Sequence, residues 1–122
     1  SFVRDQLLLF DDGAGSSYQQ PPGETRTYSA PRRYAIAGNT ATEVWHYLAD
    51  PPIYSPFCSS VYDDAANNYF IDYTLAGPNI STDLVGLDAT GSVAFYYQYP
   101  LVVGCGTAWN AVPIHLEDLH FK

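Results

Sequence analysis

The sequence predicts an all-β protein of antiparallel strands, arranged as about two β-propeller-like blades, with a small β-sandwich as the alternative. Hydrophobic residues make up 47% of the 122 residues and charged residues 15%, a balance that favours a packed core over disorder. Aromatic residues reach 16%, including 11 Tyr, and these side chains favour pleated, half-buried surfaces. Turn signals recur about every 8–12 residues, the spacing of a sandwich or propeller.

Gly, Pro, Asn and Asp bound each expected strand, because they interrupt a ladder or close a turn. In chain order, strands are expected over residues 3–10, 32–36, 41–48, 69–75, 83–88 and 92–99, with short extended pieces at 54–58 and 61–62. Turns are expected at 11–17, 38–40, 63–68, 77–79 and 89–91, and a longer loop at 18–27. The segment 109–121 is expected to form a last hairpin or a closing strand.

Strand 41–48 has a clear alternation. Thr42, Val44 and His46 are expected on one face, and Glu43, Trp45 and Tyr47 on the other.

A repeat divides the chain. The hairpin that contains residues 33–36 and 43–47 resembles the one that contains 84–87 and 93–97, with an offset of 51 residues at both strands (33 to 84, 45 to 96). A period near 50 residues with about four strands per unit is typical of a propeller. We therefore expect one β domain over residues 1–122, with blade-like units at 3–48 and 54–99 and a closing tail at 100–122.

Charge and composition limit the partners and the compartment. The net charge is −8, from 13 acidic and 5 basic residues, so nucleic acid, whose phosphates are bound by Lys and Arg, is not expected as a partner. No apolar run approaches the roughly 18 residues of a membrane span. Lys122 is the single lysine, the two cysteines form an even pair, and Asn79-Ile80-Ser81 is a glycosylation sequon. Together these features predict an extracellular or periplasmic protein, with Asn79 as the candidate glycosylation site.

An ordered set of short motifs carries a family resemblance. The apolar strand that ends in Phe10-Asp11-Asp12-Gly13 resembles a motif of the arylsulfate sulfotransferase family, in which such a strand ends in Phe-Asp-Asn-Gly. Further pieces follow in the family's order and at similar spacing: Tyr28-Ser29-Ala30, Arg33-Tyr34-Ala35-Ile36, Val44-Trp45-His46-Tyr47 and Tyr54-Ser55-Pro56. The similarity is good over residues 3–60 and looser through the hairpin at 91–99.

The resemblance implies a β-propeller, periplasmic or extracellular, that moves a sulfuryl group between phenols with a histidine nucleophile, further histidines and an arginine. Cationic donors are needed because charge develops on the sulfuryl oxygens, and imidazole can carry the group. The sequence departs from this pattern. Residues 13–17 contain no Arg, Ala30 replaces the arginine of a Tyr-Ser-Arg step, residues 78–84 contain no His, and the family's earlier histidines would precede Ser1. No catalytic residue is therefore carried over, and no cofactor is expected.

The histidines do not suggest a metal site. His115 and His120 are five residues apart, whereas residues on the same face of a strand are two or four apart, and Glu117 or Asp118 would have to complete the site. Surface or capping roles are therefore expected for these two residues, and a packed or edge position for His46.

Paired acids and cysteines have simpler structural interpretations. Asp11-Asp12 and Asp63-Asp64 lie in turn sequences, where turn chemistry is favoured over calcium binding. Cys58 and Cys105 are expected to form a disulfide, because no neighbouring base points to a nucleophilic cysteine.

Serines 55, 59 and 60 lack the Gly-x-Ser-x-Gly context of a hydrolase. The Tyr-rich run at 95–99 favours a half-exposed strand, with a carbohydrate-stacking surface as the alternative.

Two blades leave open strand edges with unpaired N–H and C=O groups, and uncovered apolar faces. We therefore expect a non-catalytic structural protein that pairs with copies of itself through its strands, as a filament subunit if the contact is head-to-tail. The segment with Val3, Leu7, Leu8, Leu9 and Phe10 is the strand expected to be donated, being terminal and apolar. The alternatives are a C-terminal fragment of a secreted arylsulfate sulfotransferase and a glycan-binding module.

Overall fold

The computed structural model describes residues 2–18, 21–78, 80–106, 108–115, 117, 119 and 120. The all-β prediction is confirmed: the described strands form two antiparallel four-stranded sheets, ordered β1-β2-β3-β4 (sheet 1) and β5-β6-β7-β8 (sheet 2). The elements are β1 (Phe2–Val3), β2 (Gln6–Asp11), β3 (Ala30–Ala37), β4 (Thr40–His46), β5 (Ser60–Ala65), β6 (Asn68–Ala76), β7 (Ser81–Leu87), β8 (Val93–Pro100) and the 3₁₀ turn η1 (Gly104–Gly106).

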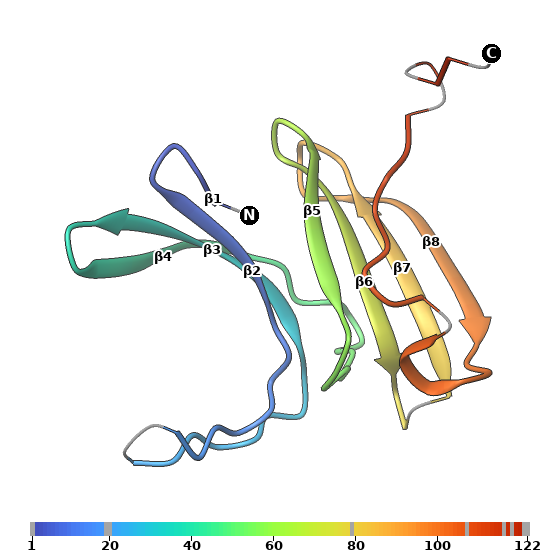
Figure 1. The fold of residues 1–122 in the computed structure, drawn as a ribbon, viewed down its shortest axis with the longest axis horizontal. Coiled ribbons are helices and arrows are strands. Elements are labelled where there is room, and N and C mark those ends of the chain that lie inside the picture. The colour runs from blue at the N-terminus through green and yellow to red at the C-terminus, as the bar shows by residue number, and fades with distance from the viewer. Residues whose placement is uncertain are drawn as a thin grey trace.

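Each sheet is a meander, because its strand order equals the chain order. The two sheets stand next to each other with β2 beside β5, as adjacent propeller blades do (Figure 1). The two repeated hairpins predicted from the sequence are β3–β4 and β7–β8, the third and fourth strands of their sheets. No described segment forms a helix long and apolar enough to cross a membrane.

The core lies between the two sheets and is built largely from aromatic and branched side chains. Leu8 of β2 joins a buried cluster with Val61, Tyr69, Ile71, Tyr73, Ala76, Val85 and Leu87 of sheet 2. Phe10 meets Tyr73 edge to face with ring centroids 5.4 Å apart, and Trp45 stacks on Tyr69 at 4.0 Å. Each such pair adds about 0.5–1.5 kcal/mol beyond the area that it buries. These contacts fix one face of each sheet against the other.

The predicted strand 3–10 is interrupted. Arg4 and Asp5 both adopt positive φ (50° and 59°) and form a two-residue turn between β1 and β2, with Val3 paired to Gln6. Hairpin turns of this length favour positive φ at both central residues, usually through Asn-Gly. The sequence Arg-Asp gives no such signal, so the segment looked like one continuous strand.

A β-bulge overturns the predicted face assignment in β4. Arg33 pairs with Trp45, but the next residue, Tyr34, pairs with Glu43, so Val44 is the extra residue. Glu43 and Trp45 therefore lie on opposite faces, although they are two residues apart. Trp45 points into the core, whereas Glu43 points away from it.

Two further predictions are corrected. The turn expected at 63–68 is only two residues long, because β5 continues through Ala65 and the chain reverses at Ala66 and Asn67, where Asn67 has φ 64°. Neither the last hairpin nor the closing strand expected over 109–121 is present in the described residues of that segment. There the chain lies across sheet 2 instead, so its polar groups bond to side chains rather than to a strand.

Candidate functional site: the outer faces of the two sheets

Each sheet has a second face that points away from the core, which we call its outer face. On sheet 1, Leu7 and Leu9 alternate with the buried Leu8 and are half-buried. Their cross-strand partners are Tyr34 and Arg32. The outer face of sheet 1 therefore carries two leucines beside polar residues.

Ion pairs organise the rest of this face. The Arg32 Nε donates to Asp11 Oδ2 at 2.7 Å, and its Nη1 donates to Glu43 Oε2 at 2.6 Å. The Nδ1 of His46 lies 2.8 Å from the other oxygen of Glu43, and Arg26 also pairs with Asp11. Burial alone would lower the pKa of Arg32, but the hydrogen bonds to Glu43 and Asp11 raise it above its ordinary value. The bulge at Val44 makes this network possible, because it brings Glu43 and His46 to the same face.

Aromatic rings cover part of the outer face of sheet 2. The Phe95 ring lies 6.0 Å from the Phe70 ring and 5.6 Å from the Tyr97 ring. Phe95 rests directly on Gly86, where a Cβ atom would lie 2.1 Å from its ring. Every residue of β8 is exposed, and Tyr97 has 61% of its surface open to solvent. This strand therefore presents an apolar strip at the outer margin of the sheet.

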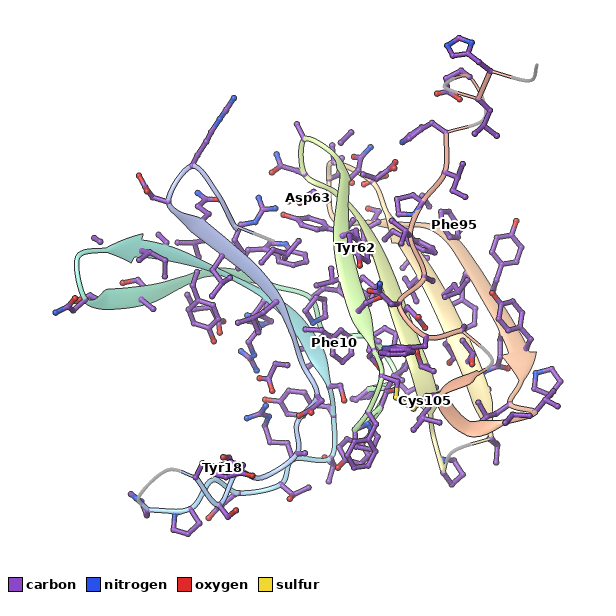
Figure 2. All side chains as sticks on the ribbon, in the orientation of Figure 1. Phe10, Tyr18, Tyr62, Asp63, Phe95 and Cys105 are labelled. Atoms are coloured by element: carbon purple, nitrogen blue, oxygen red, sulfur yellow. A yellow bond between two sulfur atoms is a disulfide. The ribbon has the colours of Figure 1, made fainter. Side chains whose placement is uncertain are left out.

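The segment 101–115, as far as it is described, crosses the β5–β6 half of this outer face, and we call it the strap (Figure 1). The Cys58–Cys105 disulfide anchors the strap near the start of β5, which confirms the predicted bond. The Thr74 hydroxyl oxygen lies 3.1 Å from the carbonyl oxygen of Ala108, Tyr62 donates to Asn110, and His115 lies 2.8 Å from Asp64. Figure 2 shows Cys105 and Tyr62 on the strap side of the sheet, with Phe95 beyond it on β8.

Asp72 lies beneath the strap with no exposed surface. One oxygen accepts a hydrogen bond from the Ala111 amide at 3.2 Å, and the other accepts one from Thr74 at 3.0 Å. Burial raises the pKa of Asp72 to about 6, although both hydrogen bonds oppose the shift. An acid in the middle of the apolar strand 69–75 is the sequence signal that could have identified this position.

A second buried acid lies on the core side of sheet 2. Asp83 accepts hydrogen bonds from Tyr96 at 2.5 Å and from Gln98 at 3.0 Å. Burial, followed by the bond to Asp83, raises the pKa of Tyr96 to about 12. Nearby Tyr73 is fully buried, and its hydroxyl has no hydrogen-bond partner within the described structure. Sequence reasoning missed this cluster because its members lie on three different strands.

The other predicted positions separate clearly. Leu8 and Phe10 point into the core and Leu7 and Leu9 lie on the outer face of sheet 1, while the backbone of Val3 pairs with that of Gln6. Asn79 lies outside the described residues.

The two acid pairs behave differently from each other. Asp11 and Asp12 accept from the amides of Gly13 and Ala14, as turn residues do. Asp63 and Asp64 instead lie in β5, where they pair with Arg33 and His115. No three potential metal ligands converge in the part of the chain that the structure describes.

Comparison with known families identifies the family of this chain. The family model described as Arylsulfotransferase (ASST) matches residues 2–99, which include all eight strands apart from the last residue of β8. The chain belongs to the arylsulfotransferase family. Searches of curated proteins and of solved structures returned no match.

The Tyr-Ser steps shared with the arylsulfotransferase family have a structural role in this chain. The Ser29 hydroxyl donates to the Asp12 carbonyl at 2.6 Å and accepts from the Ser55 amide at 2.8 Å. The Ser55 hydroxyl in turn accepts from the Leu75 amide at 2.9 Å. Both serines are fully buried. These serines therefore link the segment before β3 to β6.

The positions where the arylsulfotransferase resemblance leads one to expect cations hold none. Ala30 is buried at the start of β3, and residues 13–17 and 78–84 contain neither Arg nor His. The disulfide is a bond typical of oxidising compartments.

Proposed function

We propose that this arylsulfotransferase-family chain is a non-catalytic structural protein of the periplasm or extracellular space that associates with copies of itself. The observation that carries the proposal is that each sheet buries one face on its neighbour and keeps apolar side chains on the other. On sheet 1 these residues are the half-buried Leu7 and Leu9, and on sheet 2 they are the exposed Phe95 and Tyr97. A sheet in a propeller is normally covered on both faces by adjacent blades.

The contact within the chain is a template for the contact between chains. Sheet 1 already packs on sheet 2 through Phe10, Tyr73, Trp45 and Tyr69. We infer that the outer face of sheet 1 in one copy packs face to face on the outer face of sheet 2 in the next copy, as the inner faces of the two sheets do within one chain. Such a contact is heterologous, so the rotation per copy decides between a closed ring and an open filament.

The strap limits where the second copy can lie. It already covers the β5–β6 half of the outer face of sheet 2, through bonds to Thr74, Asp72 and Asp64. The free half is the β7–β8 side with Phe95 and Tyr97. The proposed contact therefore centres on β8.

Strand donation remains a separate prediction. Donation of the segment with Val3, Leu7, Leu8, Leu9 and Phe10 requires β2 to leave β3 and requires Leu8 and Phe10 to leave the core. Association through outer faces needs no such rearrangement. A disulfide engineered between β2 and β3 distinguishes the two modes, because it blocks donation and leaves face packing intact.

The test uses one variant for each face and a matched control. Tyr97→Ser removes an exposed ring from sheet 2, Leu7→Gln removes a leucine from sheet 1, and Tyr18→Ser removes a ring that is 99% exposed in the distant loop (Figure 2). We expect Tyr97→Ser and Leu7→Gln each to lower the native mass measured by light scattering, whereas Tyr18→Ser leaves it unchanged.

A mixture of the two face variants gives the most discriminating measurement. Tyr97→Ser retains the outer face of sheet 1, and Leu7→Gln retains the outer face of sheet 2. These two faces are complementary, so an equimolar mixture should form a heterodimer and no larger assembly. Two variants that remain monomeric when mixed, at concentrations where the wild type associates, would refute the head-to-tail contact.

The family match favours a second candidate, a C-terminal part of a secreted arylsulfate sulfotransferase. Such a fragment would be active only together with the blades that it lacks. A longer reading frame with further Trp- and His-bearing blades, whose full-length product transfers a sulfuryl group from an aryl sulfate to a phenol, would support this candidate over the non-catalytic role.

A further inference from the structure

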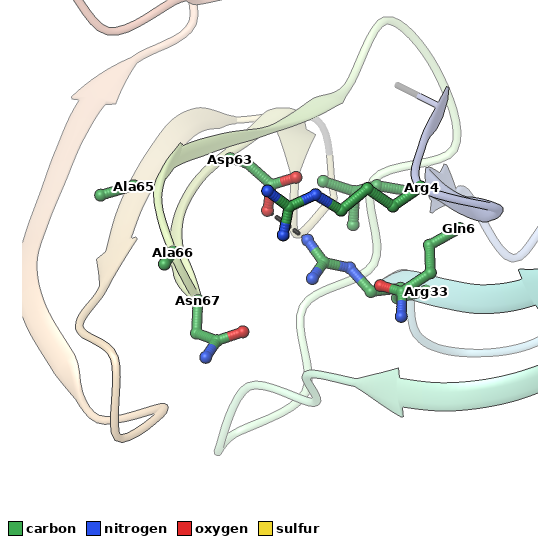
Figure 3. A pocket seen from close by; sticks show the side chains of 8 residues that line it. Arg4, Gln6, Arg33, Asp63, Ala65, Ala66 and Asn67 are labelled. Carbon is green, nitrogen blue, oxygen red and sulfur yellow. Dashed lines mark hydrogen bonds and ion pairs between the residues drawn. The ribbon is translucent and has the colours of Figure 1, made fainter.

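A groove of about 460 Å³ opens between the two sheets, on the side where the β1–β2 and β5–β6 turns face each other. Figure 3 shows Arg4 and Arg33 reaching into it from sheet 1 toward Asp63, with Asn67 across the opening. Gln6 and Leu8 complete the wall from β2. The volume lies in the range of about 300–1,000 Å³ that is typical of small-molecule sites.

The groove is cationic in an otherwise acidic protein of net charge −8. Arg33 is held by Asp63 and lies over the Tyr69 ring at 5.1 Å from its centroid. Arg26 and Arg32 are neutralised elsewhere by Asp11 and Glu43. Among the described residues, Arg4 has no ion-pair partner, so the groove contains one guanidinium that is free to bind an anion.

The backbone conformation of the β1–β2 turn places Arg4 at the groove. Arg4 and Asp5 form the two-residue turn with positive φ, a conformation uncommon for residues other than glycine. The Asp5 carbonyl accepts a hydrogen bond from the Ile36 amide at 2.8 Å, which ties the turn to β3. The guanidinium is therefore presented from an anchored turn.

We propose that this groove binds an acidic sugar, with one carboxylate and several hydroxyl groups. The planar fork of Arg4 suits a carboxylate, which it can bind with two parallel hydrogen bonds. Asp63 can accept from sugar hydroxyls, and the amides of Gln6 and Asn67 can both donate and accept. Ala65 and Ala66, which are exposed in the lining, add small apolar side chains that the C–H face of a sugar ring can contact. This site is separate from both outer faces and does not depend on self-association.

The test is calorimetric titration with glucuronate, a diglucuronide, glucose and inorganic sulfate. We expect glucuronate to bind and glucose not to bind. If the diglucuronide binds more tightly than glucuronate, the ligand comes from a polysaccharide rather than from a free sugar acid. Arg4→Gln should weaken glucuronate about tenfold or more, the loss expected for a charged hydrogen bond. Arg4→Lys should recover only part of the affinity, because it keeps the charge and loses the fork.

Arg26→Gln is the matched control, since it removes one positive charge outside the groove and should change the affinity less than twofold. Thermal unfolding of each variant verifies that it is folded. Equal binding of glucose and glucuronate, or equal losses in Arg4→Gln and Arg26→Gln, would overturn the proposal. Sulfate binding as tightly as glucuronate would also overturn it, because the groove would then be a general anion site.

Discussion

At the residue scale, Asp72 is a carboxyl group enclosed between β6 and the strap, with its pKa raised to about 6 by burial. In the unfolded chain an aspartate titrates near 3.9. The folded state therefore binds more protons between these two values, so this group lowers stability as pH rises and its full penalty is present above pH 6.

We predict that acidification from pH 7 to pH 5 stabilises the wild type relative to Asp72→Asn by about 1 kcal/mol. Urea unfolding of both proteins at the two pH values measures this difference, and the pH dependence of the other carboxyl groups cancels in the comparison. Asp88→Asn is the control, because turn hydrogen bonds from Thr90 and Ser92 lower the pKa of Asp88 and keep its titration below pH 5. Equal pH dependence in wild type and Asp72→Asn would contradict the assignment.

At the element scale, the strap is the part of the chain that sequence reasoning failed to describe. Hydrophobic alternation and turn residues predicted most strands within a few residues, because these signals are local. The strap has no such period. Its position is set by Cys58–Cys105 and by side-chain bonds from Asp72 and Thr74, which are distant in the sequence.

The bulge at Val44 shows the same limit within a strand. One extra residue reverses the face of everything that follows it. The sequence predicted the strand and an alternation of its faces, but it placed Glu43 on the same face as Trp45, whereas the bulge puts them on opposite faces. The ion-pair network on the outer face of sheet 1 could therefore not be predicted.

Loss of the disulfide should release the strap without unfolding the core. The two cysteines are 47 residues apart, so the chain-entropy model predicts that Cys58→Ser/Cys105→Ser costs about 4 kcal/mol. Hydrogen exchange should become much faster at the Ala111 amide, which is bonded to Asp72, than at amides paired between β6 and β7. Equal loss of protection in both places would show that the strap and the sheets unfold as one unit.

At the scale of the whole molecule, charge opposes association while the outer faces favour it. Each copy carries a net charge of −8, so copies repel each other over about 10 Å at 0.1 M salt. We predict that added sodium chloride strengthens self-association, because it screens this repulsion and leaves the burial of apolar faces largely unaffected. Dynamic light scattering across a salt series measures the effect, and dissociation at high salt would indicate a contact dominated by ion pairs.

Sedimentation velocity of the wild-type chain over a concentration series measures the proposed self-association without any mutation. If the outer faces of sheet 1 and sheet 2 bind each other, the weight-average mass should rise with concentration above that of one 13.5 kDa chain, and Tyr97→Ser should abolish the rise. A folded wild type that stays at the mass of a single chain from micromolar to millimolar concentration would show that the outer faces do not bind each other.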